Sequence, residues 1–263
     1  MTTYSPTDIS FAVAKETVAG TTPANPAWKK VDHIPGTSPV YTSDFTEASV
    51  VTAGRASAGA SKTNFRVEGG IKTNFNADPA IDLFLQSAFA GEWTEAGETG
   101  EGDDILKASD KDTSLSVRKT INGAAPLVSR HTGIQVSKMT LTCEASGHAE
   151  IQFDFMGMGR VVGAPAVMAG ETFQEASTTA KLTGKNVSVS IGGLTGVQFR
   201  SFELTVEQTK EAFDTFGSTS AAGIGTNGNR KANLNLSFYR KDLQPQTLFG
   251  EDRTVPVTIP VSP

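Results

Sequence analysis

The sequence predicts a mainly β protein, and three observations support this prediction. A strand-like segment occurs twice, because residues 132–144 and 195–207 agree at six of thirteen positions, starting with Thr-Gly-x-Gln and ending with Leu-Thr-x-Glu. Each copy leads into a run in which apolar and polar residues alternate, which is the period of a half-buried strand. Strong helix signals occur in a single segment, residues 79–90.

The duplicated unit is a strand pair. The apolar positions of the second strand are Ala149, Ile151, Phe153 and Phe155 in one copy and Ala232, Leu234, Leu236 and Phe238 in the other, and the polar positions between them are Glu150, Gln152 and Asp154 and Asn233, Asn235 and Ser237. A lone amphipathic hairpin is not stable and must bury its apolar face against another sheet. The two units, about 132–157 and 195–240, therefore indicate a paired-sheet architecture.

The N-terminal third contains further strands. Ile9, Phe11 and Val13 alternate with small or polar residues and predict a first strand. Residues 19–51 are rich in Pro, Thr and Ser, which favours a long extended arm or an irregular edge strand over a helix. Residues 66–75 predict another strand, with a bulge at Gly69 and Gly70.

The helix at 79–90 has signals at both ends. Asp78 is a suitable N-cap, Pro79 occupies the first helical position, and Gly91 follows the end. The apolar residues on one face are Ile81, Phe84, Leu85 and Phe89. This stripe is expected to cover an open face or end of a sheet.

The remaining predicted elements lie between and after the repeats. Residues 105–108 and 114–120 predict strands. The C-terminal arm, 251–263, contains Pro256 and Pro260, which exclude a central strand and leave an edge strand or a free arm.

Composition limits the function. The 263 residues are expected to form a single domain, and 23 Lys and Arg against 28 Asp and Glu include no basic cluster of the kind that binds nucleic acid. The first residues lack the features of a signal peptide, and no segment approaches the roughly 20 apolar residues of a membrane span. We therefore expect a protein made in the cytoplasm and without a membrane partner.

The sequence offers no pattern for catalysis, a cofactor or a metal. Cys143 is the single cysteine, and the three histidines have no metal-ligand spacing. Gly223, Gly225 and Gly228 spell G-x-G-x-x-G, but they are not placed between a strand and a helix as dinucleotide binding requires. The acidic segment 92–104 lacks a calcium-loop pattern and is expected to be a solvated loop.

The two copies differ in the loop that joins their strands. The first copy uses a short turn, whereas the second inserts residues 208–229, a Gly-rich and mobile loop by its composition. Loops of this length are usually functional or disordered. Phe213 and Phe216 either insert into a partner or fold back onto the domain.

The order of these segments resembles a known family. The segments ISFAVAKETVAGTTPANPAWKKV, VEGGIKTNFNADPAIDLFLQSAFAGEW, TSLSVRKTI with HTGIQVSKMTLTCEASGHAEIQFDFMGMG, and TGVQFRSFELTVE with ANLNLSFYRKD carry the likeness. Together they resemble the major tail tube proteins of long-tailed, non-contractile bacteriophages over nearly the whole chain.

The resemblance implies both fold and function. It implies a β-sandwich or partial barrel of antiparallel strands with one short flanking helix and long loops. It further implies homohexameric rings that stack into the virion tail tube, through which double-stranded DNA passes without specific binding. The implied partners are other copies of the chain, a tape measure protein, a tail terminator and tail-tip proteins, with no enzymatic activity.

Two sets of residues follow from this interpretation. The polar positions expected nearest the lumen are Glu150, Gln152, Asp154, Asn233, Asn235 and Ser237. Those expected in contacts between subunits or rings are Trp28, Phe213, Phe216, Pro256 and Pro260, in the arm 19–51, the loop 208–229 and the C-terminal arm.

Three alternatives remain open from the residues. Another virion protein, such as a head decoration or baseplate component, would share the folding pattern. A carbohydrate-binding β-sandwich usually presents a platform of Trp or Tyr, whereas these residues are scattered here. An enzyme on a β scaffold is the least favoured, because His and Cys are few.

Overall fold

The computed structural model describes residues 5–48, 59–96, 104–123, 125–163, 167–192, 194, 197–239, 246 and 255–260. The prediction of a mainly β fold is confirmed. An α-helix, α1 (Pro79–Phe89), and two 3-10 helices, η1 (Pro6–Asp8) and η2 (Gly184–Asn186), accompany the strands. The strands are β1 (Ile9–Lys15), β2 (Ala27–Val31), β3 (Val40–Glu47), β4 (Ala60–Glu68), β5 (Gly70–Asn74), β6 (Trp93–Thr94), β7 (Ile105–Leu106), β8 (Leu115–Ile121), β9 (Leu127–Glu144), β10 (Glu150–Met156), β11 (Gly159–Val162), β12 (Thr172–Gln174), β13 (Ser190–Ile191), β14 (Gln198–Glu207), β15 (Lys210–Phe213), β16 (Gly223–Thr226), β17 (Lys231–Tyr239) and β18 (Val257–Thr258).

A ten-stranded sheet forms the body of the molecule. Its main path is β12-β2-β1-β8-β9-β10-β5, while β11 and β14 also pair with β9, and β17 pairs with β14. All these pairs are antiparallel apart from β12 with β2. The sheet is not closed, in agreement with the expected sandwich or partial barrel.

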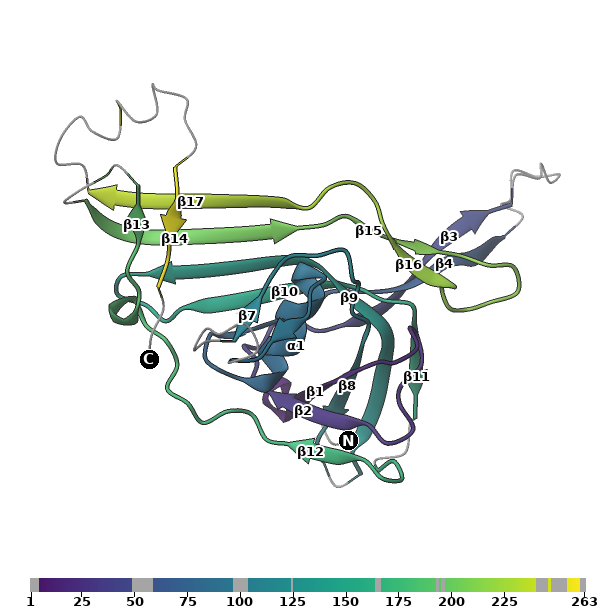
Figure 1. Ribbon diagram of the computed structural model, residues 1–263. Coiled ribbons are helices and arrows are strands. Elements are labelled where there is room, and N and C mark those ends of the chain that lie inside the picture. Colours follow the sequence, from purple (N-terminus) through teal and green to yellow (C-terminus); the bar gives the residue numbers. More distant parts are fainter. Residues whose placement is uncertain are drawn as a thin grey trace.

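Strand β9 folds the sheet into two layers. The first part of its 18 residues pairs with β8 and β11, and its later part pairs with β10 and β14. Figure 1 shows β9 curving between these layers. Gly133 lies where the partners of β9 change from one layer to the other. Its φ is 68°, and its N–H donates to the Glu16 carboxylate at 3.0 Å. A left-handed residue without Cβ permits the bend there.

Helix α1 begins and ends close to the predicted positions. Asp78 caps it by accepting from the Ala80 N–H at 2.8 Å, and Pro79 is its first residue. The left-handed position at the end is taken by Ala90, with φ of 46°, and not by a glycine. Gly91 is needed for a different reason, because a Cβ there would lie 2.1 Å from the Lys107 carbonyl oxygen.

The main core lies between the two layers and α1 (Figure 1). The Phe84 ring of α1 lies 5.1 Å from the Phe153 ring and 5.4 Å from the Phe155 ring, centre to centre. Phe11 and Val117 enter the same cluster from the other layer. Each such side chain contributes roughly 1.5–3 kcal/mol by leaving water, so the helix joins the layers as its apolar stripe predicts.

The two copies of the repeat lie side by side in one layer. Their expected strands are confirmed as β9 with β10 and β14 with β17, and β14 also pairs with β9. Leu141 is opposite Leu204, Ile151 is opposite Leu141, and Leu234 is opposite Leu204. Equivalent residues therefore meet around a local twofold axis between β9 and β14. The copies do not face each other across the core; they share one sheet and bury the same face of it.

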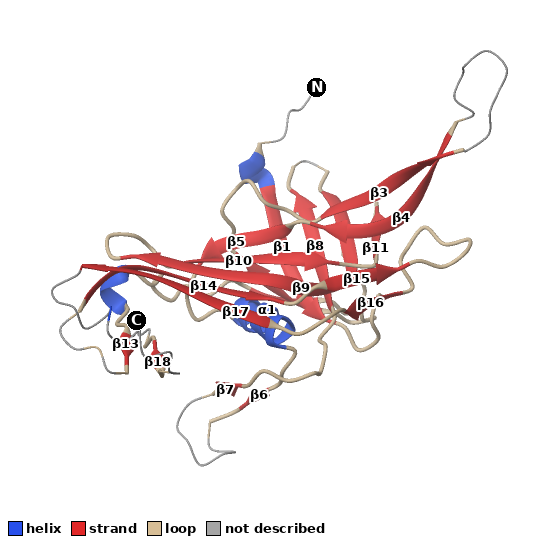
Figure 2. Cartoon of the chain, turned by 90° about the horizontal axis from the view of Figure 1, so that it is seen from above, coloured by secondary structure: helices blue, strands red, loops and turns tan. Residues whose placement is uncertain are grey.

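The segment 19–51 contains two strands in its described part, residues 19–48. β2 joins the large sheet, and β3 forms a hairpin with β4 that projects from the body in both views (Figures 1 and 2). The strand expected at 66–75 is divided at Gly69, where φ is 100°. Its two parts, β4 and β5, keep one register along β10, because Val67 bridges Gly157 and Gly70 pairs with Asp154.

The predicted strands at 105–108 and 114–120 correspond to β7 and β8, and β7 pairs with β6. The insertion 208–229 is not an unstructured loop, because β15 and β16 form a hairpin within it. Glu98, Glu101 and Asp103 of the acidic segment lie outside the described residues.

Candidate assembly surfaces

One face of the repeat layer is polar throughout. Directly opposite residues of antiparallel strands point to the same side of a sheet, so the registers define this face. It comprises Lys138, Thr140, Thr142 and Glu144 of β9, Glu150, Gln152 and Asp154 of β10, Ser201, Glu203, Thr205 and Glu207 of β14, and Lys231, Asn233, Asn235 and Ser237 of β17. We call this surface the polar face.

The six polar residues singled out in the sequence all lie on the polar face. The contributions of β9 and β14 were missed, although Thr140, Thr142, Glu203 and Thr205 alternate with apolar residues just as the predicted positions do. The signal was present in the repeated segments themselves. Only the register shows that the strands lie side by side and extend one surface.

The polar face carries a mild negative charge. Its carboxylates are Glu144, Glu150, Asp154, Glu203 and Glu207, and its cations are Lys138 and Lys231. One row across the four strands, through Gln152, Thr140, Thr205 and Asn233, is uncharged. At the border, Lys72 of β5 pairs with Glu150 at 2.7 Å. Such a surface has no cluster of cations to hold a polyanion.

The layer ends in the nine-residue strand β17, which pairs with β14 alone among the described strands. The N–H groups of Ala145 and Gln208 donate to Arg200 and Ser137 at the two ends of the β9–β14 ladder. Because backbone groups alternate in direction along a strand, the amides of Ala232, Leu234 and Leu236 point away from β14. Strand β17 is therefore a long edge able to accept another strand.

The two phenylalanines of the insertion differ in exposure. Phe216 is fully exposed, at 108% of the reference area, whereas Phe213 is 52% exposed and its ring lies over Gly225. The Phe213 ring therefore packs across its own hairpin, and the Phe216 ring does not fold back onto the domain. The hairpin itself is attached to the body, because the Ala221 N–H donates to the Met158 carbonyl at 3.0 Å and Lys210 Nζ lies 2.6 Å from Asp112 Oδ1.

The other expected contact residues are placed differently. Trp28 is completely buried and donates from Nε1 to Glu171 Oε2 at 3.0 Å, so it has no surface left for a neighbour. This expectation is corrected: the Pro-rich surroundings suggested an exposed arm, but β2 lies inside the sheet. Pro256 and Pro260 are exposed, and their carbonyls accept from Gly192 and Ser188 beside the β13–β18 pair.

The titratable groups associated with catalysis are dispersed. Burial lowers the pKa of His131 to about 4, with Arg160 and Lys119 contributing. Burial lowers the pKa of His33 and raises that of the Cys143 thiol. Within the described ranges, no group of three or more His, Cys, Asp or Glu side chains is arranged to hold a metal ion. None of the helices in these ranges has the length and hydrophobicity needed to cross a membrane.

Comparison with protein families decides the identity. Residues 6–260 match the family model described as phage tail tube protein. The chain belongs to the phage tail tube family. No curated protein matches it closely enough to count as a relative. The match covers the strands, the helix and all the surfaces described above, and a tail of the non-contractile type is consistent with the family.

Membership assigns a structural role in the virion. A tail tube protein is a component of the phage tail that assembles with copies of itself and with other tail proteins. The family is a structural one.

Proposed function

We propose that the whole chain acts as a single tube domain that forms closed, homohexameric rings, and that these rings stack into the conduit for DNA ejection. The observation that carries this proposal is the polar face on a layer that ends in the free edge of β17. A layer that is apolar on one side, polar on the other and bordered by an edge that pairs with no further described strand is suited to continue into a neighbouring subunit.

Ring closure would provide hydrogen-bond partners for the backbone groups at the edge of β17. The outward backbone groups of β17, which include those of Ala232, Leu234 and Leu236, would pair with a strand of the next subunit. Closing a set of sheets into a ring removes unpaired edges, as closure does in a barrel. The hexameric number is the family expectation, and the free edge supports closure without determining the number.

The polar face would line the bore. Its net negative charge would repel phosphates weakly and would offer no cations whose counterion release favours binding. The uncharged row through Thr140 and Thr205 supports the same interpretation. Double-stranded DNA would then pass without being held at any one ring.

Three projecting parts would connect subunits and rings. They are the β3–β4 hairpin, whose Phe45 is 68% exposed, the β15–β16 hairpin with Phe213 and Phe216, and the C-terminal segment with Pro256 and Pro260. The ends of the tube would contact the tape measure, terminator and tail-tip proteins. Assembly would take place in the host cytoplasm before the tail joins the virion.

Electron microscopy and chemical labelling test the proposal together. Concentrated protein is expected to form hollow stacked rings in negative stain. In these tubes, an Asn235→Cys variant should react with a small maleimide but not with a PEG-maleimide too large to enter the bore. The same cysteine in the monomer should react with both reagents. A Val18→Cys variant, at a position that is 64% exposed outside the polar face, serves as the control.

Two results would contradict this proposal. Protein that remains monomeric even when seeded with isolated tail tips would exclude self-assembly. Tubes in which Asn235→Cys reacts freely with the large reagent would place the polar face outside the bore.

A further inference from the structure

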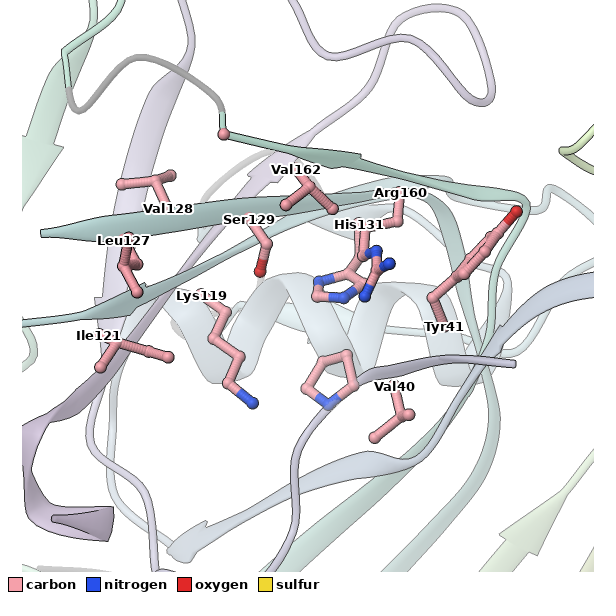
Figure 3. Close-up of a pocket in the computed structure, with 12 residues that line it drawn as sticks. Val40, Tyr41, Lys119, Ile121, Leu127, Val128, Ser129, His131, Arg160 and Val162 are labelled. Carbon is pink, nitrogen blue, oxygen red and sulfur yellow. The ribbon is translucent and has the colours of Figure 1, made fainter. Parts of the chain in front are cut away.

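A cavity of about 390 Å³ opens beside β8, β9, β11 and the start of β3 (Figure 3). Its apolar walls are Pro39, Val40, Ile121, Leu127, Val128 and Val162. Several of these side chains remain open to solvent: Val40 is 51%, Leu127 is 55% and Val162 is 64% exposed. Exposed aliphatic groups around one concavity form a receptor for an apolar side chain.

The same cavity carries two cations. Lys119 and Arg160 line it together with His131, whose lowered pKa leaves it neutral near pH 7, and the lining includes no carboxylate, in a chain with a net charge of −5. The side chains of His131 and Arg160 lie next to each other in Figure 3, and Lys119 extends into the same space. The Arg160 guanidinium lies 4.9 Å from the centre of the Tyr41 ring. An occupant with both an apolar group and an anionic group would complement this lining.

His131 supplies a second sign of an incomplete site. Its side chain is 2% exposed, and its Nδ1 atom has no hydrogen-bond partner among the described residues. A buried polar atom without a partner is costly. The residue lines the cavity, but the atom itself is closed to solvent, so an occupant would have to displace a neighbouring side chain to provide the missing partner.

A group with the required chemistry lies in a neighbouring turn of the same chain, which Tyr41 of the cavity lining contacts. Phe216 is fully exposed, and Asp214 beside it is also exposed. Their turn is held by the β15–β16 hairpin and by Tyr41, whose hydroxyl donates to the Thr219 carbonyl. A turn already held in place loses little conformational entropy when it binds. Phe216 does not line the cavity of its own subunit.

We propose that the Phe216 turn of one subunit inserts into this cavity of a second copy, with Asp214 close to Arg160 and Lys119. The inference rests on the proposed tube function and adds a specific contact to it. When the second copy does not return the contact to the first, the contact is heterologous and produces a closed ring or a continuing stack. Both arrangements are what a tube requires.

Cysteine cross-linking between two differently tagged copies tests the contact. One copy carries Phe216→Cys and the other carries Val162→Cys, while the native Cys143 is buried. Oxidation under assembly conditions should give a disulfide between the two tags only when both variants are present. As a control, the second copy carries Val18→Cys in place of the cavity substitution. Val18 and Val162 are both 64% exposed, and the control pair should give no cross-link.

Charge reversal provides a test that does not depend on sulfur chemistry. Asp214→Arg alone and Arg160→Asp alone should each raise the concentration needed for assembly by about tenfold, the effect of losing one favourable ion pair. The combined variant should recover most of this loss. Phe216→Ala should weaken assembly while leaving the unfolding midpoint of the monomer unchanged, because the ring is fully exposed.

The possible outcomes separate this contact from the tube function. Tubes without the cross-link, or without recovery in the combined variant, overturn the contact and leave the tube function standing. Loss of assembly in Arg160→Asp together with wild-type assembly in Phe216→Ala also overturns it, because another segment then occupies the cavity. Cross-linked chains that never form tubes support the contact and contradict the tube function. The absence of both tubes and cross-links would contradict the contact and the tube function.

Discussion

The two copies of the repeated strand pair have similar sequences and different surroundings. In the first copy, Ile151 and Phe153 are at most 1% exposed, α1 covers the apolar face, and β5 pairs with the outer edge. In the second copy, Leu234 and Leu236 are half-buried, and the outer edge of β17 has no described strand beside it. The second copy therefore extends the layer beyond the part that the core supports.

The two copies of the strand pair therefore differ in how completely their own chain packs around them. The first copy receives a complete set of neighbours from its own chain. The apolar face of the second copy is covered by smaller contacts from Val187, Val189 and Ile259. The first unit is therefore fully packed within the subunit, and the second unit has an outer edge with no described strand beside it.

The strongest way to test the comparison is to truncate equivalent side chains. Ile151 and Leu234 occupy the same place relative to the local twofold axis. Ile151→Ala should lower the free energy of unfolding by about 3 kcal/mol, as expected for a fully buried aliphatic side chain. Leu234→Ala should lower it by about 1 kcal/mol, because that side chain is half in water already. Urea unfolding of the monomeric protein measures both.

Equal losses in the two variants would contradict the comparison. They would mean that the second copy is as well supported as the first in solution. A changed urea dependence in either variant would indicate a change in the unfolded state, so the slope serves as the control.

A second test uses the residue that precedes each copy, which is His131 in the first and Leu194 in the second. The pKa of His131 is lowered to about 4 by burial and nearby cations. Between about pH 6.5 and pH 4, the unfolded chain takes up a proton there and the folded chain does not, so acid should destabilise the fold. The loss should be at most about 3 kcal/mol.

The His131→Leu variant gives the first copy the residue of the second. Its free energy of unfolding should fall less steeply between pH 6.5 and pH 4 than that of the unmodified protein. The difference between the two profiles isolates this histidine from the carboxylates that also titrate. Parallel profiles would show that His131 does not contribute the expected pH dependence.

The smallest effect on the monomer is expected at the open edge. The Ala149 N–H donates to the Leu182 carbonyl at 2.9 Å, whereas the equivalent amide of Ala232 points out from the edge of β17. Ala149→Pro should lower the free energy of unfolding by about 2 kcal/mol, since it leaves a buried acceptor without its donor. Ala232→Pro should change it by less than about 1 kcal/mol but should prevent edge pairing.

Unfolding and sedimentation measurements on both proline variants check this expectation. An Ala232→Pro protein that sediments as tubes would exclude β17 as the edge joined between subunits. An Ala232→Pro protein that unfolds as readily as Ala149→Pro would show that the edge is important within the subunit itself.

The local elements follow from the sequence because their signals are local. The alternation at 149–155 predicts β10, and Asp78 and Pro79 predict the start of α1. The polar positions of β10 and β17 are correctly grouped by alternation alone. The position of Trp28 is not predictable in this way, because its burial depends on the Glu171 carboxylate, which lies far away in the sequence.

The sequence by itself determined the strand periodicity, the helix, the duplication and the polar character of the alternate positions, since each depends on residues close together in the chain. Only the tertiary structure decided that the two copies share one sheet, that β17 is its open edge, and that Lys119, His131 and Arg160 line one cavity. These features depend on strand order and register. Register is set by the packing of the whole layer, and no local pattern encodes it.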